Sequence, residues 1–222
     1  LEMMDQGIVE AVEAAYGFGF PLDAAAVLLI EVDGLEVAVD DEAKQIIDLC
    51  EEQGAREVRQ AESEQQRALL WKCRKQAFGA IGRLSPSYCT QDGVVPRTKL
   101  PEILEFITGA GERHEIRIVN VFHAGDGNIH PILLFDERDE DQIARVMRAS
   151  DEILGKCIDL GGSVTGEHGI GVEKLDFMDR LFTEDDLLVM AGVRSAFNPR
   201  GTCSPGKVLP TAGACGMEHI ER

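Results

Sequence analysis

The feature that most constrains the fold is a predicted β-hairpin near the middle of the chain. Two runs rich in apolar and β-branched residues, 116–122 and 129–135, flank the turn sequence Gly125-Asp126-Gly127-Asn128. Asp-Gly between two such runs is the strongest short-range hairpin signal in a sequence. The sequence therefore predicts that neighbouring strands pair antiparallel.

Hydrophobic periodicity and capping signals predict the other elements. Helices are expected at residues 1–21, 40–53, 62–82 and 101–108, then from about 143 to a stop at Gly161-Gly162, and from Thr183 to about 197. Strands are expected at 24–33, where seven apolar residues predict burial, and at 56–61, with an extended segment at 91–96. This pattern predicts the α+β class, a ferredoxin-like antiparallel sheet covered by helices on one face.

The predicted domain organisation has three parts. Residues 1–22 are expected to be a partial N-terminal segment or an inter-domain helix, and 23–197 the main domain. Residues 198–222 are rich in glycine and proline and are expected to wrap as a tail.

The net charge of −18 excludes several classes of partner. An acidic chain has no obvious attraction to phosphate backbones or anionic lipid, so neither nucleic acid nor a membrane surface is expected. The longest apolar stretch is too short for a bilayer span, and the acidic start lacks a secretory signal. The six cysteines show no C-x-x-C spacing. We therefore expect reduced thiols in a cytoplasmic protein.

Two histidines lie beside the predicted turn. With Asp126-Gly127 as a two-residue turn, the paired positions are 125 with 128, 124 with 129, and His123 with His130. The two imidazoles would then share one face, about 5 Å apart between Cβ atoms, which suits one divalent metal ion given a third ligand. The alternative is that the histidines only cap the hairpin through hydrogen bonds.

A glycine-rich segment at 161–171 supplies a candidate third ligand. Its only ionisable side chains are the adjacent Glu167 and His168. Glu167 could complete the metal site and leave His168 as a free base. The alternative is a helix end and turn in which both side chains are solvated.

Three other sequence patterns give little support for a function. The segment 201–208 approaches a phosphate-binding loop, but Val208 cannot ligate magnesium and Pro205 removes an amide donor. A complete G-x-G-x-x-G is absent, and Cys89 lacks a nucleophile signature.

Three motifs in order resemble the C-terminal half of FAD-linked 2-hydroxyacid oxidoreductases. They are NVFHAGDGNIHP at 120–131, GGSVTGEHGIG at 161–171 and NPRGTCSPGKVLP at 198–210. Within that family the sequence is most similar to the FAD-linked subunits of glycolate oxidase, with D-lactate and D-2-hydroxyglutarate dehydrogenases as relatives. The resemblance implies that this chain is the cap, or substrate, domain, and that an N-terminal domain holding most FAD contacts is missing. This chain alone would then be inactive.

The resemblance also implies roles for individual residues. His123, His130 and Glu167 match ligands of a divalent metal such as zinc or manganese, and His168 matches the base beside the flavin. Arg74 matches the arginine that binds the substrate carboxylate, and Asn128 a polar position of the active site. Thr90 stands where some dicarboxylate-binding relatives have lysine, which favours a small monocarboxylate such as glycolate or D-lactate over 2-hydroxyglutarate.

The partners implied are a small 2-hydroxy acid, the chain's own FAD domain and other glycolate oxidase subunits. Two alternatives remain open. One is a non-catalytic acidic α+β interaction module without flavin. The other is a metal-dependent hydrolase, because two histidines and one glutamate also suit water activation.

Overall fold

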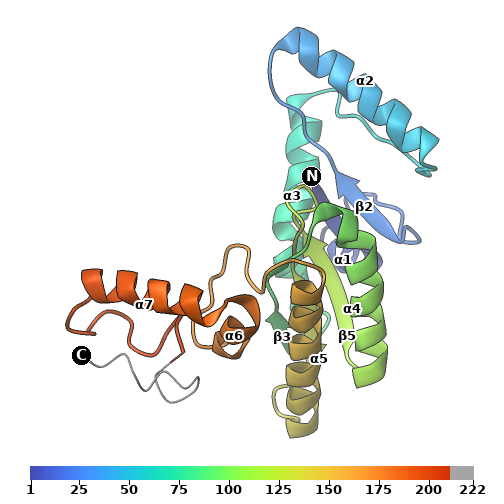
Figure 1. Cartoon of the computed structure of the whole chain (residues 1–222). Coiled ribbons are helices and arrows are strands. Elements are labelled where there is room, and N and C mark those ends of the chain that lie inside the picture. Colours follow the sequence, from blue (N-terminus) through green and yellow to red (C-terminus); the bar gives the residue numbers. More distant parts are fainter. Residues whose placement is uncertain (211–222) are drawn as a thin grey trace.

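A five-stranded antiparallel sheet forms the centre of the molecule (Figure 1). The computed structural model describes residues 1–210. The strand order is β2 (Ala26–Leu29), β1 (Glu2–Asp5), β5 (Arg117–Phe122), β7 (Pro131–Phe135) and β3 (Ser87–Thr90). A second sheet pairs β4 (Gly93–Val94) with β6 (Asn128–Ile129). The α+β prediction is confirmed.

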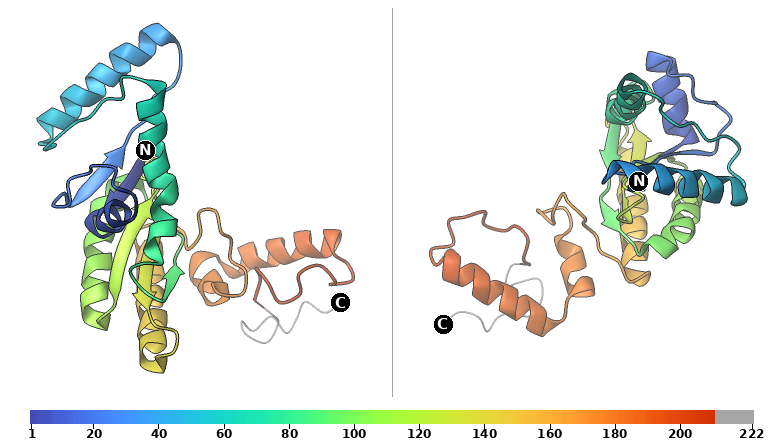
Figure 2. Two further views of the ribbon diagram at one scale, coloured as in Figure 1. Left: turned by 180° about the vertical axis from the view of Figure 1, so that it is seen from behind. Right: turned by 90° about the horizontal axis from the view of Figure 1, so that it is seen from above.

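Helices cover both faces of the sheet, so the expectation of a single covered face was wrong. On one face, Val119 and Val121 of β5 pack in the core with α1 (Gln6–Tyr16) and α3 (Glu64–Ile81). On the other face, Ile118 and Phe122 pack with α4 (Leu100–His114) and α5 (Glu140–Asp159), which lie side by side. Both layers are visible from behind and from above in Figure 2. Residues of β5 that point to opposite faces of the sheet are therefore apolar alike, because helices bury both faces.

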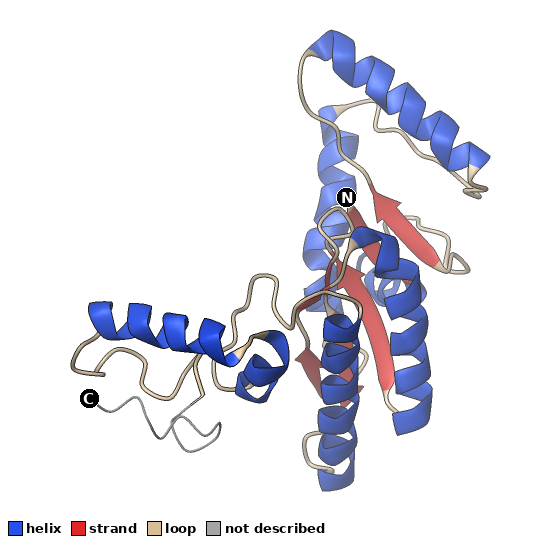
Figure 3. Ribbon diagram, in the orientation of Figure 1, coloured by secondary structure: helices blue, strands red, loops and turns tan. Residues whose placement is uncertain are grey.

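Two parts project from this body (Figure 3). One is α2 (Glu36–Glu52), which stands beyond the edge of the sheet. The other is an arm of η2 (Leu175–Phe177), α6 (Met178–Leu181) and α7 (Glu184–Phe197). A capping box of Thr183 and Asp186 begins α7, as the sequence predicted. The short η1 (Arg97–Lys99) leads into α4.

The hairpin forms with a register two positions away from the predicted one. His123 pairs with Asn128, and residues 124–127 form a four-residue loop. Gly127 has φ +75°, and a Cβ there would lie 2.1 Å from the carbonyl oxygen of Val95. Position 127 therefore requires glycine both because of the turn and because the 95–97 segment approaches closely. A shift of two keeps every side chain on its face, so His123 and His130 still share one side of the sheet.

The sequence had suggested a separate segment at the start of the chain, but in the structure this part belongs to the central sheet. β1 lies between β2 and β5, and α1 follows it directly. The Asp5 side chain accepts a hydrogen bond from the Ile8 amide and so separates strand from helix. This part belongs to the same folded unit as the rest of the sheet.

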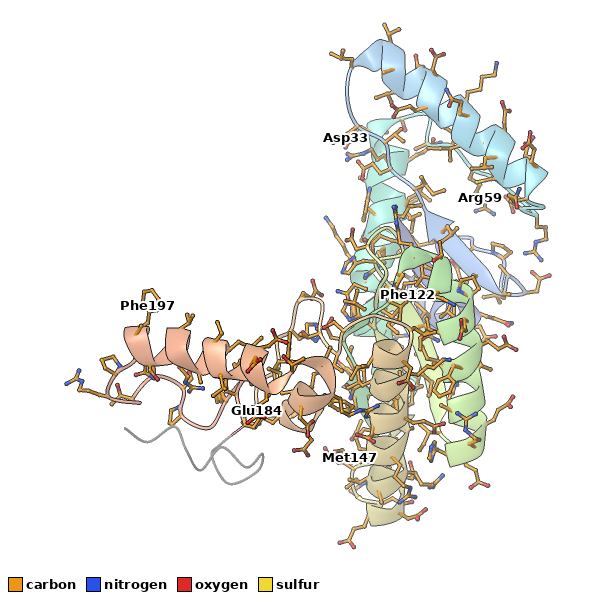
Figure 4. All side chains as sticks on the ribbon, in the orientation of Figure 1. Asp33, Arg59, Phe122, Met147, Glu184 and Phe197 are labelled. Atoms are coloured by element: carbon orange, nitrogen blue, oxygen red, sulfur yellow. The ribbon has the colours of Figure 1, made fainter. Side chains whose placement is uncertain are left out.

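Three further expectations were wrong. Segment 24–33 forms only the short β2, an edge strand with Leu28 55% exposed. Segment 56–61 has no strand, and Arg56 instead pairs with Asp23. Met147, expected on the apolar stripe of α5, is exposed and points away from the body (Figure 4).

Among residues 1–210, helices long and apolar enough to span a bilayer are absent. Half of the predicted tail, 211–222, lies outside the described residues.

Candidate active site

The candidate site lies at the end of the central sheet, on the face covered by α3. His123 follows β5 on the same side as Val121, and His130 precedes β7 on that side. Glu2 lies on the same face of the neighbouring strand β1, because it is two residues from the buried Met4. The alternation of the strands thus brings one carboxylate and two imidazoles to one place.

The glycine-rich segment reaches these histidines through β4. Val94 and Ser163 exchange two backbone hydrogen bonds of 2.8 and 2.9 Å, and β4 pairs with β6 beside the hairpin turn. A Cβ on Gly162 would lie 1.8 Å from the Val94 carbonyl oxygen. Glycine is therefore necessary for this contact, which carries Glu167 to the sheet end.

His123, His130 and Glu167 form a cluster of three possible metal ligands. One ligand atom from each lies within 4.8 Å of the others. The Glu167 Oε1 atom is 3.2 Å from His130 Nε2 and 3.8 Å from His123 Nε2. Two ligands of a tetrahedral zinc ion are about 3.4 Å apart, given bonds of about 2.1 Å. The donor set and its spacing fit a divalent cation such as zinc.

Both imidazoles point their Nε2 atoms toward Glu167, because the Nδ1 atoms contact other groups. His123 Nδ1 is 2.7 Å from Glu2 Oε1, and His130 Nδ1 is 3.2 Å from the backbone carbonyl oxygen of Gln91. Burial lowers the pKa of His130, which favours the neutral ring that a metal ligand must be.

Asp92, which the sequence analysis missed, holds the segment that carries Glu167 and His168. Its Oδ2 atom accepts hydrogen bonds from the Thr165 hydroxyl and from the backbone amides of Gly166, Glu167 and His168, at 2.7 to 3.2 Å. Burial alone would raise the pKa of Asp92, but these donors outweigh it and lower the pKa to about 2. The carboxylate is therefore charged, and it fixes three consecutive amides.

Lys174 contacts Asp92 and so stabilises the same segment. The buried Nζ donates to the carbonyl oxygens of Asp92 and Val164, at 2.8 and 2.6 Å, and lies 3.8 Å from Asp92 Oδ2. Burial lowers the pKa of Lys174. Neither Asp92 nor Lys174 has a motif of its own; an acidic residue in the predicted extended segment 91–96 was the only available signal.

His168 lies at the open side of the cluster. Its ring stacks on His130 with 5.2 Å between centroids and 17° between planes. About half of the His168 and Glu167 side chains is exposed, against 3% for His130. The imidazole is therefore available to a molecule that binds over the cluster.

The structure also brings Arg74 and Asn128 to this region. The Nε atom of Arg74 in α3 donates to Glu2 Oε2 at 2.8 Å, so one carboxylate joins Arg74 to His123. Asn128 is buried at the hairpin, where a Cβ on Gly166 would lie 2.6 Å from its side-chain amide. Within residues 1–210, Asn128 Oδ1 has no hydrogen-bond partner.

The comparisons with known proteins agree with the motifs. The profile of the family "FAD linked oxidases, C-terminal domain" matches residues 1–208. The glycolate oxidase subunit GlcD of Escherichia coli K12 is 43% identical over 99% of this chain and 45% of its own length. A mitochondrial D-lactate dehydrogenase (cytochrome) of Arabidopsis thaliana is 25% identical over 95% of this chain and 37% of its own length.

A solved structure supports the fold at low sequence identity. The 4-ethylphenol oxidase of Gulosibacter chungangensis superposes with a TM-score of 0.64 at 11% identity, over 95% of this chain and 47% of that one. The chain thus spans less than half the length of these relatives. The family profile, which covers almost the whole chain, shows that this chain belongs to the family of FAD linked oxidases, C-terminal domain.

Proposed function

We propose that this chain is the substrate domain of an FAD-dependent 2-hydroxyacid oxidoreductase of the glycolate or D-lactate type. The observation that carries the proposal is the cluster of His123, His130 and Glu167, with the His168 ring stacked beside it. Family membership supports FAD as the cofactor, and the names of the relatives support a 2-hydroxy acid as substrate.

Each residue of the site suits one requirement of 2-hydroxy acid oxidation. The hydroxyl must lose its proton, and the half-exposed imidazole of His168 suits a base. The substrate carboxylate must be held, and Arg74 is a fixed cation near the cluster. Asn128 would add an amide contact. Bound FAD would supply the acceptor for the hydride that leaves C2.

The donor cluster supports a divalent metal site. His123, His130 and Glu167 would hold the ion, and a bound zinc or manganese ion would supply a Lewis acid for the substrate hydroxyl. The hydrogen bonds to Glu2 and to the Gln91 carbonyl support this role, because metal-ligating histidines usually donate their other ring N–H to such acceptors.

The open side of the site supports a second domain over it. A catalytic centre for hydride transfer excludes water, yet about half of Glu167 and His168 is exposed here. We propose that an N-terminal FAD domain of the complete protein covers this side and that residues 198–222 pack against it. We further propose a cytoplasmic protein that works with other glycolate oxidase subunits, a relation supported by the name of the E. coli relative. Cell fractionation and co-purification test both.

The decisive experiment uses the protein encoded by the complete gene. Anaerobic mixing with glycolate or D-lactate should bleach the flavin absorbance, whereas D-2-hydroxyglutarate should do so more slowly. Changing His123→Ala or His130→Ala should abolish bound metal, measured by elemental analysis, together with flavin reduction. Unreduced flavin with both monocarboxylates would overturn the proposal. Full activity without bound metal would overturn the metal assignment alone.

A further inference from the structure

Glu2 occupies the position that joins the candidate metal ligands to Arg74. Its side chain is 13% exposed at the start of β1. The Oε1 atom lies 2.7 Å from His123 Nδ1, and the Oε2 atom accepts the Nε–H of Arg74 at 2.8 Å. Both carboxylate oxygens are thus engaged, each by a different part of the site.

The chemistry of these partners determines where the His123 proton lies. An ionised carboxylate only accepts hydrogen bonds, and arginine Nε–H only donates. The ring atom 2.7 Å from Glu2 Oε1 must therefore carry a hydrogen, so the neutral His123 ring is protonated at Nδ1. Its Nε2 atom keeps a free lone pair, and Nε2 is the atom that faces Glu167.

His130 reaches the same tautomer by an independent route. Its Nδ1 atom faces the Gln91 carbonyl oxygen at 3.2 Å, which is also only an acceptor. Gln91 acts through the backbone, so side-chain replacement cannot remove that contact. Glu2 is therefore the one of these two orienting groups that mutation can test.

The same carboxylate orients Arg74. Because Glu2 takes the Nε–H, the two terminal NH₂ groups of the guanidinium remain for another acceptor. Among the described residues, Glu2 is the hydrogen-bond partner of this buried side chain, and the Phe78 ring lies 6.0 Å from its Cζ atom.

We propose that Glu2 is a positioning residue that fixes His123 as an Nε2 metal ligand and at the same time orients Arg74 toward the substrate carboxylate. The inference rests on the proposed function for the roles of His123 and Arg74. The assigned tautomer itself depends only on the contacts of Glu2.

The change Glu2→Gln tests this assignment because it preserves size and removes one acceptor. The Gln amide oxygen would accept from Arg74 Nε, since an NH₂ group there would oppose another donor. The amide NH₂ would then face His123 Nδ1 and favour the tautomer protonated at Nε2, in which Nε2 cannot ligate a metal. In the complete protein labelled with ¹⁵N-histidine and freed of metal, long-range ¹H–¹⁵N spectra at a pH where imidazole is neutral should show this exchange. His123→Gln assigns the signal.

Metal binding gives the second measurement. Titration with Zn²⁺ alone, in competition with a chelator, should show about 10- to 100-fold weaker binding for Glu2→Gln, the usual effect of losing such an orienting partner. Asp5→Asn is the matched control. Asp5 is a partly buried carboxylate on the same strand. It contacts Ile8 and Asn120 but neither histidine, and asparagine caps a helix as well as aspartate does. This control should keep the wild-type tautomer and Zn²⁺ affinity.

Wild-type protein with the His123 proton on Nε2 would overturn the proposal without any variant. An unchanged tautomer in Glu2→Gln would also overturn it, as would equal losses of Zn²⁺ affinity in Glu2→Gln and Asp5→Asn, since those would reflect general destabilisation. Failure of glycolate or D-lactate to reduce the flavin would contradict the proposed function, but it would leave the tautomer result unaffected.

Discussion

At the scale of the residue, substitutions of His168 and Arg74 should have different effects on kcat and KM. The proposed base, His168, would act only as the O–H bond breaks, so His168→Ala in the complete protein should lower kcat by about 10²- to 10⁴-fold with little change in KM. Arg74 would contact the carboxylate in ground and transition states alike, so Arg74→Ala should mainly raise KM. Steady-state rates with D-lactate and glycolate measure both. Near-normal kcat in His168→Ala would assign the base to another group.

Asp92 gives a prediction about acid stability. Its folded-state pKa of about 2 lies below the ordinary value of 3.8, so its contribution is present above about pH 4 and lost as the pH falls toward 2. The shift corresponds to about 2 kcal/mol. Urea unfolding of wild type and Asp92→Asn should therefore differ by a constant free energy at neutral pH. That difference should shrink between pH 4 and pH 2, and a difference independent of pH would contradict the assignment.

The residues of the candidate site divide by the kind of signal they leave in a sequence. His123, His130, Glu167 and His168 stand in a turn motif and in a glycine-rich segment, where few other side chains can act. Glu2 stands in the short strand β1 and Asp92 between the short strands β3 and β4, and neither has a local pattern around it. They become important only through partners 121 and 76 positions away, His123 and His168. Long-range contacts of this kind follow from the fold and cannot be obtained from local sequence.

At the scale of the element, the adjacent glycines Gly161 and Gly162 form a natural matched pair. Gly162→Ala places a Cβ 1.8 Å from the Val94 carbonyl oxygen, and this backbone cannot yield without separating β4 from the Glu167 segment. Gly161 has φ +78° but an open surrounding, so Gly161→Ala adds only backbone strain.

The expected costs in unfolding free energy are about 1 kcal/mol for Gly161→Ala and about 3 kcal/mol or more for Gly162→Ala. Only Gly162→Ala should also weaken Zn²⁺ binding, because it displaces Glu167. Denaturant unfolding and metal titration measure the two effects. Equal costs for the two variants would mean that the contact with Val94 is unimportant.

Elements with their own capping or turn chemistry were predictable, whereas elements defined by a neighbour were not. Thr183 and Asp186 specify the start of α7 locally, and Asp126-Gly127 specifies a hairpin. The hairpin register instead depends on Val95, which packs against Gly127 from another segment. The strand β1 was missed for the same reason, because its four residues are extended through pairing with β2 and β5.

At the scale of the whole molecule, this chain expressed by itself should fold and yet bind FAD weakly or not at all. Its core clusters are contained within residues 1–210, but its relatives are more than twice its length. Circular dichroism should show helical structure with a cooperative melt, and calorimetric titration with FAD should show no sub-micromolar complex. A stoichiometric, sub-micromolar complex would place the flavin contacts in this half.

The arm supplies the last prediction. Val189, Val193 and Phe197 lie four residues apart on α7 and are 67%, 56% and 87% exposed, and Figure 4 shows Phe197 at the outer end of the helix. An apolar stripe on a projecting helix is typical of a surface that another domain covers. In this chain alone, Val193→Asp should leave the melting temperature nearly unchanged, since the side chain already faces solvent. In the complete protein the same change should lower the melting temperature by several degrees and speed FAD release, because a charge would be buried at the domain contact. Equal melting behaviour in both contexts would mean that α7 stays exposed in the complete protein, and the flavin domain would then have to cover the site from another side.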